Sequence, residues 1–236
     1  MMEVKLLRIT EEPVMAIEQA ASTCYNSEPS PEGKTMNFCL KSGHTSVLEH
    51  TYFTFEISGV SRALLAQITR HRIASFSVRS QRYCSEDGFG YVVPKTIKDN
   101  PAASTIYEKT MERIKDNYKV LQELGIPNED ARMILPNACE TVIVMSMNLR
   151  SLMNFFNERL CTCAQWEIRE CALKMKKCIV DVEPKFAPMC VPKCEKHGKD
   201  MAFCLESKKR NEECKRHPRL VDIFEDYHHY KDMCDS

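Results

Sequence analysis

The feature that most constrains this chain is a one-sided run of arginines. Residues 57–85 contain no Asp or Glu, yet five arginines fall there: Arg62, Arg70, Arg72, Arg79 and Arg82. No lysine occurs between Lys41 and Lys95. A solvated surface normally mixes both charges, whereas the planar guanidinium fork matches the paired oxygens of phosphate and carboxylate groups. The run therefore indicates a site for an anionic ligand, with ion pairs to acids elsewhere in the fold as the alternative.

The net charge limits what such a site binds. The chain has 33 Lys and Arg and 33 Asp and Glu residues, so its formal net charge is zero. Proteins that bind nucleic acid or membrane surfaces usually carry a basic excess. We therefore expect a pocket for a small anion, with neither nucleic acid nor a membrane among the partners.

The N-terminus and the cysteines bear on the cellular compartment. The start, Met1 to Lys5, lacks the basic residues and apolar run of a signal peptide. No stretch is apolar over the length that crosses a bilayer, so we expect a cytoplasmic protein. The thirteen cysteines should then be reduced, and no disulfide framework is predicted.

Hydrophobic patterning predicts alternating short strands and helices. The expected strands are an edge strand at 4–9, one at 53–57 broken by Gly59, a short piece at 91–94 and a central strand at 141–147. The expected helices cover 11–24, 38–42, 61–69, a long helix from the Asn100 cap to Gly125, a short one capped by Asn128, and 164–182 with Trp166 packed. Residues 70–83 are expected to form a loop.

Two further stretches accompany the arginine run. In the segment 44–50, Ser46 and Glu49 have the spacing of a capping box, so a helix start is a sufficient explanation. The segment 148–159 follows an acid-free run and interrupts an apolar sequence with polar residues. Its Asn154 and Arg159 have ordinary alternatives as a helix cap and a surface residue.

The composition changes beyond Glu183, where prolines and charged residues become frequent. Cysteine and histidine continue into this part at Cys190, Cys194, His197, Cys204 and Cys214. Their spacing resembles a zinc cluster only loosely, so we predict no metal site. We expect one domain at residues 1–189 and a mobile, thiol-bearing tail at 190–236.

The run Arg70-His71-Arg72 resembles the signature of the flavin-dependent thymidylate synthases, which is Arg-His-Arg, seven residues, then Ser. Ser80 falls at the required position, and Arg82 matches the extended form. The segments 44–50 and 148–155 look like the family's upstream and downstream blocks, with Arg159 at a family arginine. The segment 164–168 is also family-like, and the resemblance covers roughly residues 1–190.

The resemblance implies a fold, an assembly and a reaction. The fold is α+β, with a central, mostly antiparallel sheet flanked by helices, and the assembly is a homotetramer with active sites shared between subunits. The reaction is the reductive methylation of deoxyuridylate (dUMP) to thymidylate (dTMP). Methylenetetrahydrofolate donates the carbon, and FAD reduced by NADPH supplies the hydride.

The resemblance also implies roles for individual residues. It assigns dUMP binding to Gln67, Arg70, Val78, Arg79, Ser80, Gln81, Arg82, Arg132 and Arg159. It assigns FAD binding to Ser46, Arg70, His71, Arg72, Asn148, Arg150 and Asn154. Arg159 is the catalytic residue, because a fixed positive charge favours the ionised uracil ring. No cysteine nucleophile is required, and Val78, where many members carry an acid, has only its backbone to offer.

Three other interpretations remain open. The first is a nucleotide- or nucleic-acid-binding protein without catalysis, for which the zero net charge is unfavourable. The second is a zinc protein organised by the tail cysteines, which leaves both arginine-containing blocks unexplained. The third is a family member that has lost its activity, against which the intact Arg70, Arg72, Ser80, Arg82 and Arg159 argue.

Overall fold

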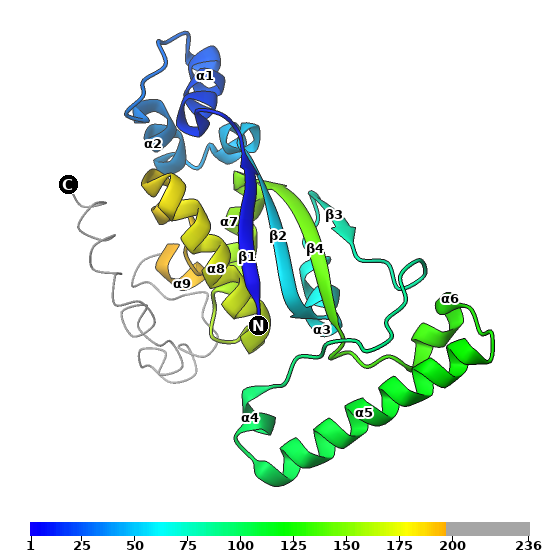
Figure 1. The fold of residues 1–236 in the computed structure, drawn as a ribbon. Helices are drawn as coiled ribbons and strands as arrows, with labels where there is room; N and C mark the ends of the chain where they lie inside the picture. The colour runs from blue at the N-terminus through cyan, green and yellow to red at the C-terminus, as the bar shows by residue number, and fades with distance from the viewer. Residues whose placement is uncertain (197–236) are drawn as a thin grey trace. The chain divides into compact units, whose positions relative to one another are not determined.

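The structure, a computed structural model, describes residues 1–196 (Figure 1). Four strands form one sheet in the order β1-β2-β4-β3. They are β1 (Glu3–Ile9), β2 (Tyr52–Ser61), β3 (Ala74–Val78) and β4 (Glu140–Asn148). The sheet is antiparallel and is accompanied by helices, so the predicted α+β class is confirmed. The predicted edge and central positions of the first and last strands are confirmed as well.

Helices account for most of the remaining described chain. The α-helices are α1 (Pro13–Tyr25), α2 (Lys34–Lys41), α3 (Arg62–Ile68), α4 (Lys95–Lys98), α5 (Pro101–Glu123), α6 (Asn128–Ala131), α7 (Leu149–Arg159), α8 (Trp166–Val182) and α9 (Lys193–Lys196). Three 3-10 helices are η1 (Thr45–His50), η2 (Arg132–Ile134) and η3 (Pro184–Met189). No helix in this part of the chain has the length and apolar character needed to span a membrane.

The chain divides into two compact units by its internal contacts. Unit 1 contains Met1–Glu3, Glu56–Arg70 and Phe76–Val144. Unit 2 contains Val4–Phe55, His71–Ser75 and the chain from Met145 onward. The arginine run is thus divided between the two units, with His71 and Arg72 in unit 2.

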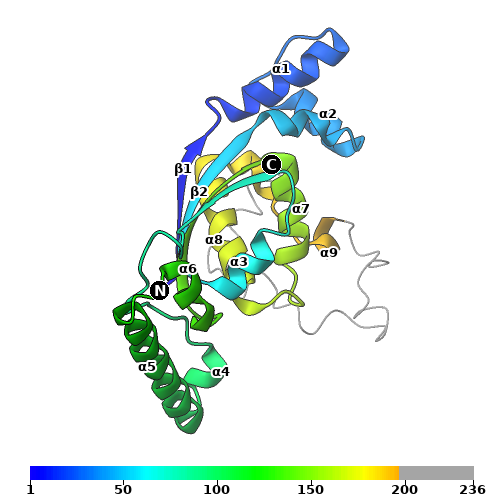
Figure 2. The ribbon, with the colours of Figure 1, turned by 90° about the vertical axis from the view of Figure 1, so that its right-hand side faces the viewer.

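Unit 2 buries the aromatic side of its strands against helices. Phe53 and Phe55 are fully buried and stack on the same face of β2, and Phe186 of η3 meets Phe53 edge-on. Thr54, which alternates with them, shares a hydrogen bond of 2.9 Å with Ser146 of β4. Helices α7 and α8 lie side by side (Figure 2). The alternation of buried Phe53 and Phe55 with Thr54 confirms the predicted period-two strand.

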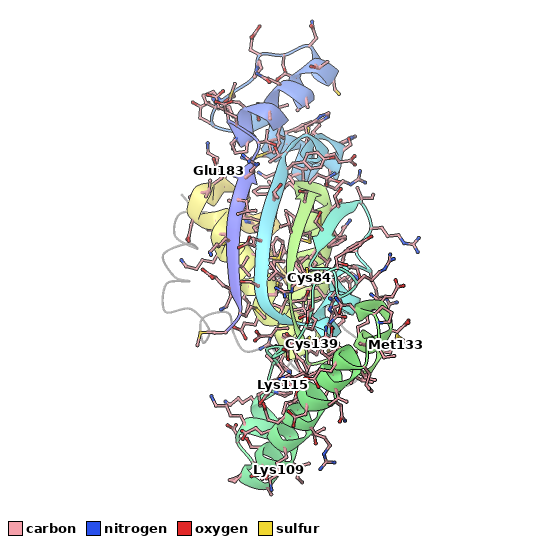
Figure 3. The ribbon with its side chains drawn as sticks, turned by 45° about the vertical axis from the view of Figure 1, so that its right-hand side comes forward. Cys84, Lys109, Lys115, Met133, Cys139 and Glu183 are labelled. Atoms are coloured by element: carbon pink, nitrogen blue, oxygen red, sulfur yellow. The ribbon has the colours of Figure 1, made fainter. Side chains whose placement is uncertain are left out.

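Unit 1 contains the long helix α5. Its cap is the predicted one, because Asn100 Oδ1 accepts from the backbone N–H of Ala103 at 3.2 Å and Pro101 follows. Met111 of α5 packs with Phe89 and Cys139 in a small apolar cluster. Lys115 lies on α5 below Cys139 (Figure 3), and its ammonium group stands over the rings of Phe89 and Tyr91.

Several local predictions are wrong. Residues 74–78 form the edge strand β3 rather than part of a loop. β2 continues through Gly59, which has a φ of 63° and lies against the backbone of Met1. A Cβ at Gly59 would stand 2.5 Å from the Met1 carbonyl oxygen, so this position requires glycine. Trp166 is 42% exposed rather than packed.

The helix predicted to begin in the segment 44–50 is a 3-10 helix, and its N-cap has no side-chain hydrogen bond. The capping box is therefore not formed. The short helix α6 begins at Asn128, but its cap position is Pro127. Of the residues named for the tail, His197, Cys204 and Cys214 lie outside the described residues, so the prediction for the tail stays a prediction there. Within 1–196, no three His, Cys, Asp or Glu side chains are grouped to hold a metal ion.

Candidate active site

Unit 1 holds most of the residues expected at the nucleotide, and Arg79 is the most tightly engaged of them. Its Nε donates to Glu86 Oε1 at 3.3 Å, and its Nη2 donates to the carbonyl of Ser85. Glu86 is 5% exposed, so this is a buried carboxylate in an ion pair with Arg79, and the charge of Arg62 also interacts with it. The Arg79 side chain therefore forms an ion pair with an acid, which was the alternative to an anion site in the sequence analysis.

Arg82 and Arg132 meet at one residue, Glu129. Arg82 Nε donates to the Glu129 carboxylate at 3.0 Å, and Arg132 Nε donates to the Glu129 carbonyl at 3.1 Å. Arg82 also stands 5.4 Å from the ring centroid of the exposed Tyr83. The structure thus brings these two arginines, which are 50 residues apart in the sequence, together at an exposed ion pair.

The turn that joins Arg82 to β3 is held by two hydrogen bonds. Ser80 Oγ accepts the backbone N–H of Arg82 at 3.2 Å, which leaves the hydroxyl proton available to another acceptor. Gln81 Nε2 donates to the buried Cys139 Sγ at 3.6 Å. Val78 ends β3 and is half-buried. Ser80 and Gln81 are therefore positioned by the fold, in a turn that starts at the end of a strand.

The two remaining residues of this set lie at the end of α3. Gln67 Nε2 donates to the carbonyl of Ala63, one turn back in the same helix, at 3.3 Å. Arg70 is exposed just beyond the helix. Its guanidinium forms no ion pair with any of residues 1–196, so it remains available to an anion.

Arg62 is a residue that the sequence interpretation counted in the run but gave no role. Its Nη2 donates to the carbonyl oxygen of Arg79 at 2.9 Å, so it fixes the start of the Ser80 turn. Burial lowers the pKa of Arg62, the nearby Cys139 and Glu86 oppose this, and Arg132 adds to it. In the sequence, the only sign that Arg62 belongs to the site is its place in the acid-free run.

In unit 2, Arg159 and His71 form a direct hydrogen bond. Arg159 Nε lies 2.8 Å from His71 Nε2, and the two residues are 88 positions apart. The His71 ring meets the buried Phe155 edge-on, with ring centroids 5.0 Å apart and an interplanar angle of 76°. Burial first, and the charge of Arg159 second, lower the pKa of His71, while Glu158 acts in the opposite direction.

The chain beside His71 has an unusual backbone conformation. Ile73 has a φ of 63°, in the left-handed region that β-branched residues rarely adopt, and its side chain is 75% exposed. Such strain persists only where surrounding structure imposes it and is concentrated at functional sites. Arg72, next to it, is exposed and forms no ion pair within the described part of the chain.

The upstream and downstream blocks also meet in unit 2. Arg150 Nη1 and Glu49 Oε1 form an ion pair across 101 residues of sequence. Asn148 is buried and caps α7, because its Oδ1 accepts the backbone N–H of Ser151 at 2.8 Å. Ser46 and Asn154 are both exposed. Glu49 is therefore a partner of Arg150, and Asn148 has a capping role in addition to the one expected.

Comparison with known proteins finds relatives that match most of the chain. A family profile described as "Thymidylate synthase complementing protein" matches residues 5–185. The flavin-dependent thymidylate synthase of Geobacter sulfurreducens is 40% identical over 205 residues, which cover 82% of this chain and 88% of the relative. That of Pyrococcus furiosus is 39% identical over 213 residues, covering 81% and 87%.

A solved structure is similar as well. The crystal structure of the flavin-dependent thymidylate synthase from Helicobacter pylori, complexed with FAD and dUMP, matches with a TM-score of 0.65 and 28% identity. The match covers 80% of this chain and 99% of that chain. Together with the family profile and the intact arginine signature, these similarities lead to one conclusion: the chain belongs to the flavin-dependent thymidylate synthase family.

Proposed function

We propose that this chain catalyses the reductive methylation of dUMP to dTMP, with methylenetetrahydrofolate as carbon donor and NADPH as the reductant of bound FAD. The observation that carries the proposal is the hydrogen-bonded Arg159 at the end of α7. It supplies a half-buried, permanently positive group in a protein whose family acts on a pyrimidine nucleotide.

The phosphate of dUMP is assigned to unit 1. Ser80 offers a free hydroxyl proton, and Arg82 and Arg132 offer guanidinium groups that Glu129 already holds close together. Phosphate oxygens accept such charge-assisted bonds strongly. Gln67, Arg70 and the backbone of Val78 and Gln81 complete the assignment. Because Glu86 occupies the Arg79 side chain, we assign Arg79 to holding the loop rather than to direct contact with phosphate.

The residues of unit 2 fit an anionic dinucleotide. Arg72 and Arg150 are exposed guanidinium groups. Arg70, which the family resemblance also assigns to the flavin, has no ion pair with any residue from 1 to 196. Ser46 and Asn154 add exposed hydroxyl and amide groups. This donor set suits the phosphates of FAD, with His71 and Asn148 assigned to it as well. Reduced FAD, when bound, supplies the hydride that completes the methyl group.

Arg159 acts on the uracil ring. A guanidinium next to the ring carbonyl and nitrogen stabilises negative charge there, which makes carbon 5 more nucleophilic. The charge does not depend on pH in the working range, because an arginine in a protein stays protonated. No cysteine is required in this scheme, and the buried Cys139 has a pKa raised to about 11 by burial, so it is a poor nucleophile.

The proposal extends to assembly, domain extent and location. We assign a homotetramer with active sites shared between subunits, a catalytic domain at 1–189 and a cytoplasmic location. Met189 and Cys190 are buried and Lys193 forms an ion pair with Glu158 at 2.8 Å, so packing continues past residue 189 and a truncation is placed after Lys196. Cross-linking and mass measurement of this truncated chain test the assembly, and a monomer with full activity would contradict the shared site.

The function is tested by Arg159→Ala, with the exposed Arg113→Ala on α5 as the matched control. Conversion of dUMP to dTMP is followed with reductant and folate present, and the flavin content is measured by absorption. We expect Arg159→Ala to keep its flavin and lose about 10²–10³-fold in kcat, because charge stabilisation of the ring is removed. Arg113→Ala should behave as the unmodified chain. Near-normal turnover of Arg159→Ala would remove the assigned role.

A further inference from the structure

The hydrogen bond between Arg159 and His71 determines the protonation state of the imidazole. Arg159 Nε carries a hydrogen at all working pH values and is only a donor. His71 Nε2, at 2.8 Å, must therefore accept with its lone pair. The ring is then neutral, with its proton on Nδ1. An imidazolium would present a second N–H to the Arg159 N–H, and the bond would be lost.

The position of the His71 ring is fixed on its other side by aromatic packing. It lies edge-on to Phe155, at 5.0 Å between centroids, and Phe155 is fully buried and packs against Phe156 at 5.5 Å. Both phenylalanines belong to α7, the helix that ends at Arg159. The imidazole is therefore held by the same rigid helix that carries the guanidinium.

The charges around His71 favour the neutral ring. Burial and the charge of Arg159 lower the pKa of the imidazole below its ordinary value of 6.5, and Glu158, also on α7, opposes them. The carboxylate of Glu158 also forms an ion pair with Lys193 of α9 at 2.8 Å, so its negative charge is shared between His71 and a lysine. Arg70 and Arg72, the chain neighbours of His71, are exposed, and Arg159 is the cation that acts on the imidazole.

We propose that His71 is a positioning residue for Arg159: its neutral imidazole anchors the Nε–H and leaves the two terminal NH₂ groups free to face the pyrimidine. This inference rests on the proposed function. Protonation of the imidazole removes the acceptor and places a like charge next to the guanidinium. The enzyme should therefore lose its alignment of Arg159 in acid, even though Arg159 itself does not titrate.

The test compares His71→Gln and His71→Phe in the full-length, flavin-loaded protein. The glutamine carbonyl oxygen is an acceptor that does not titrate, whereas the phenylalanine ring keeps the packing on Phe155 and has no acceptor. The unmodified chain should lose kcat in acid, at a pH below the ordinary imidazole pKa of about 6.5, because the pKa of His71 is lowered. His71→Gln should lose this acid limb and, at pH 8, turn over at least about tenfold faster than His71→Phe. His71→Phe should be about 10–100-fold slower at every pH.

A second measurement separates positioning from an independent contact with the flavin. The dissociation constant of dUMP is measured from the change in the flavin spectrum, with and without His71→Phe, in the unmodified chain and in Arg159→Ala. We expect His71→Phe to weaken dUMP binding in the unmodified chain and to have no further effect in Arg159→Ala, because His71 acts through Arg159.

Several results would overturn the inference: an acid limb that persists in His71→Gln, equal rates for both His71 variants, additive losses with Arg159→Ala, or loss of flavin in both variants. In each case an unmodified chain that still makes dTMP would leave the proposed function standing. Failure of the unmodified chain to convert dUMP would instead remove the proposed function itself.

Discussion

The ion pair between Arg79 and Glu86 allows a quantitative test of how unit 1 is held together. The Glu86 side chain is 6% exposed and that of Arg79 is 48% exposed, with Nε and Oε1 3.3 Å apart. At this distance Coulomb's law gives about 5 kcal/mol for an effective dielectric constant of 20 and about 1 kcal/mol in bulk water. Because one partner is buried and the other is half exposed, we expect an intermediate value.

We therefore predict that Arg79→Ala lowers the free energy of unfolding by about 2–3 kcal/mol, because it leaves a buried carboxylate without its partner. The matched control is Arg82→Ala. Arg82 pairs with Glu129 at 3.0 Å, but both side chains are about half exposed, so the expected cost is below about 1 kcal/mol. The double variant Arg79→Ala/Glu86→Gln should recover part of the loss, since the amide carries no charge to bury.

The assay is urea unfolding of all variants at one protein concentration, because association contributes to apparent stability. Binding of dUMP should rank the two variants in the opposite order. Arg82→Ala should weaken dUMP binding although it costs little stability. The reasoning would be refuted if Arg79→Ala cost no more stability than Arg82→Ala, or if the double variant were less stable than Arg79→Ala alone.

Three further predictions concern buried groups. Glu18 is fully buried and accepts the backbone N–H groups of Ser30 at 3.1 Å and Met36 at 2.7 Å. Glu18→Ala should therefore lower the unfolding free energy by about 2–4 kcal/mol, and Glu18→Gln by less, in the same urea assay. Iodoacetamide at pH 8 should label the exposed Cys84 well before the buried Cys139, as read by peptide mass spectrometry. Since burial raises the pKa of Cys139 from 9.0 to about 11, the folded state binds the extra proton between these values. Stability should fall as the pH rises through that window, and Cys139→Ser should reduce this fall.

Local sequence signals predicted the parts of the fold that depend on local chemistry. The alternation of Phe53 and Phe55 with polar residues predicted β2, and Asn100 with Pro101 predicted the start of α5. β3 was missed because its sequence, Ala74 to Val78, is short and contains two serines. Its pairing with β4 is a long-range contact that no local pattern reveals.

The candidate site was found from its arginine signature, but its pairings could not be. The partner of Arg79 is Glu86, the first acid after the acid-free run ends, so only the fold decides whether the two meet. His71 and Arg159 are 88 residues apart, and their bond follows from tertiary structure alone. The residue types thus indicated an anion site. The structure shows that Arg79 and Arg82 form ion pairs with acids, whereas Arg70 and Arg72 form none within residues 1–196.

The central claim is that the chain binds FAD and dUMP as a thymidylate synthase, and the absorption spectrum of the purified protein during a dUMP titration tests it most directly. We predict a yellow protein whose bound-flavin spectrum changes as dUMP is added, with the change lost or weakened in Arg159→Ala. A colourless protein that takes up no added FAD would contradict the account.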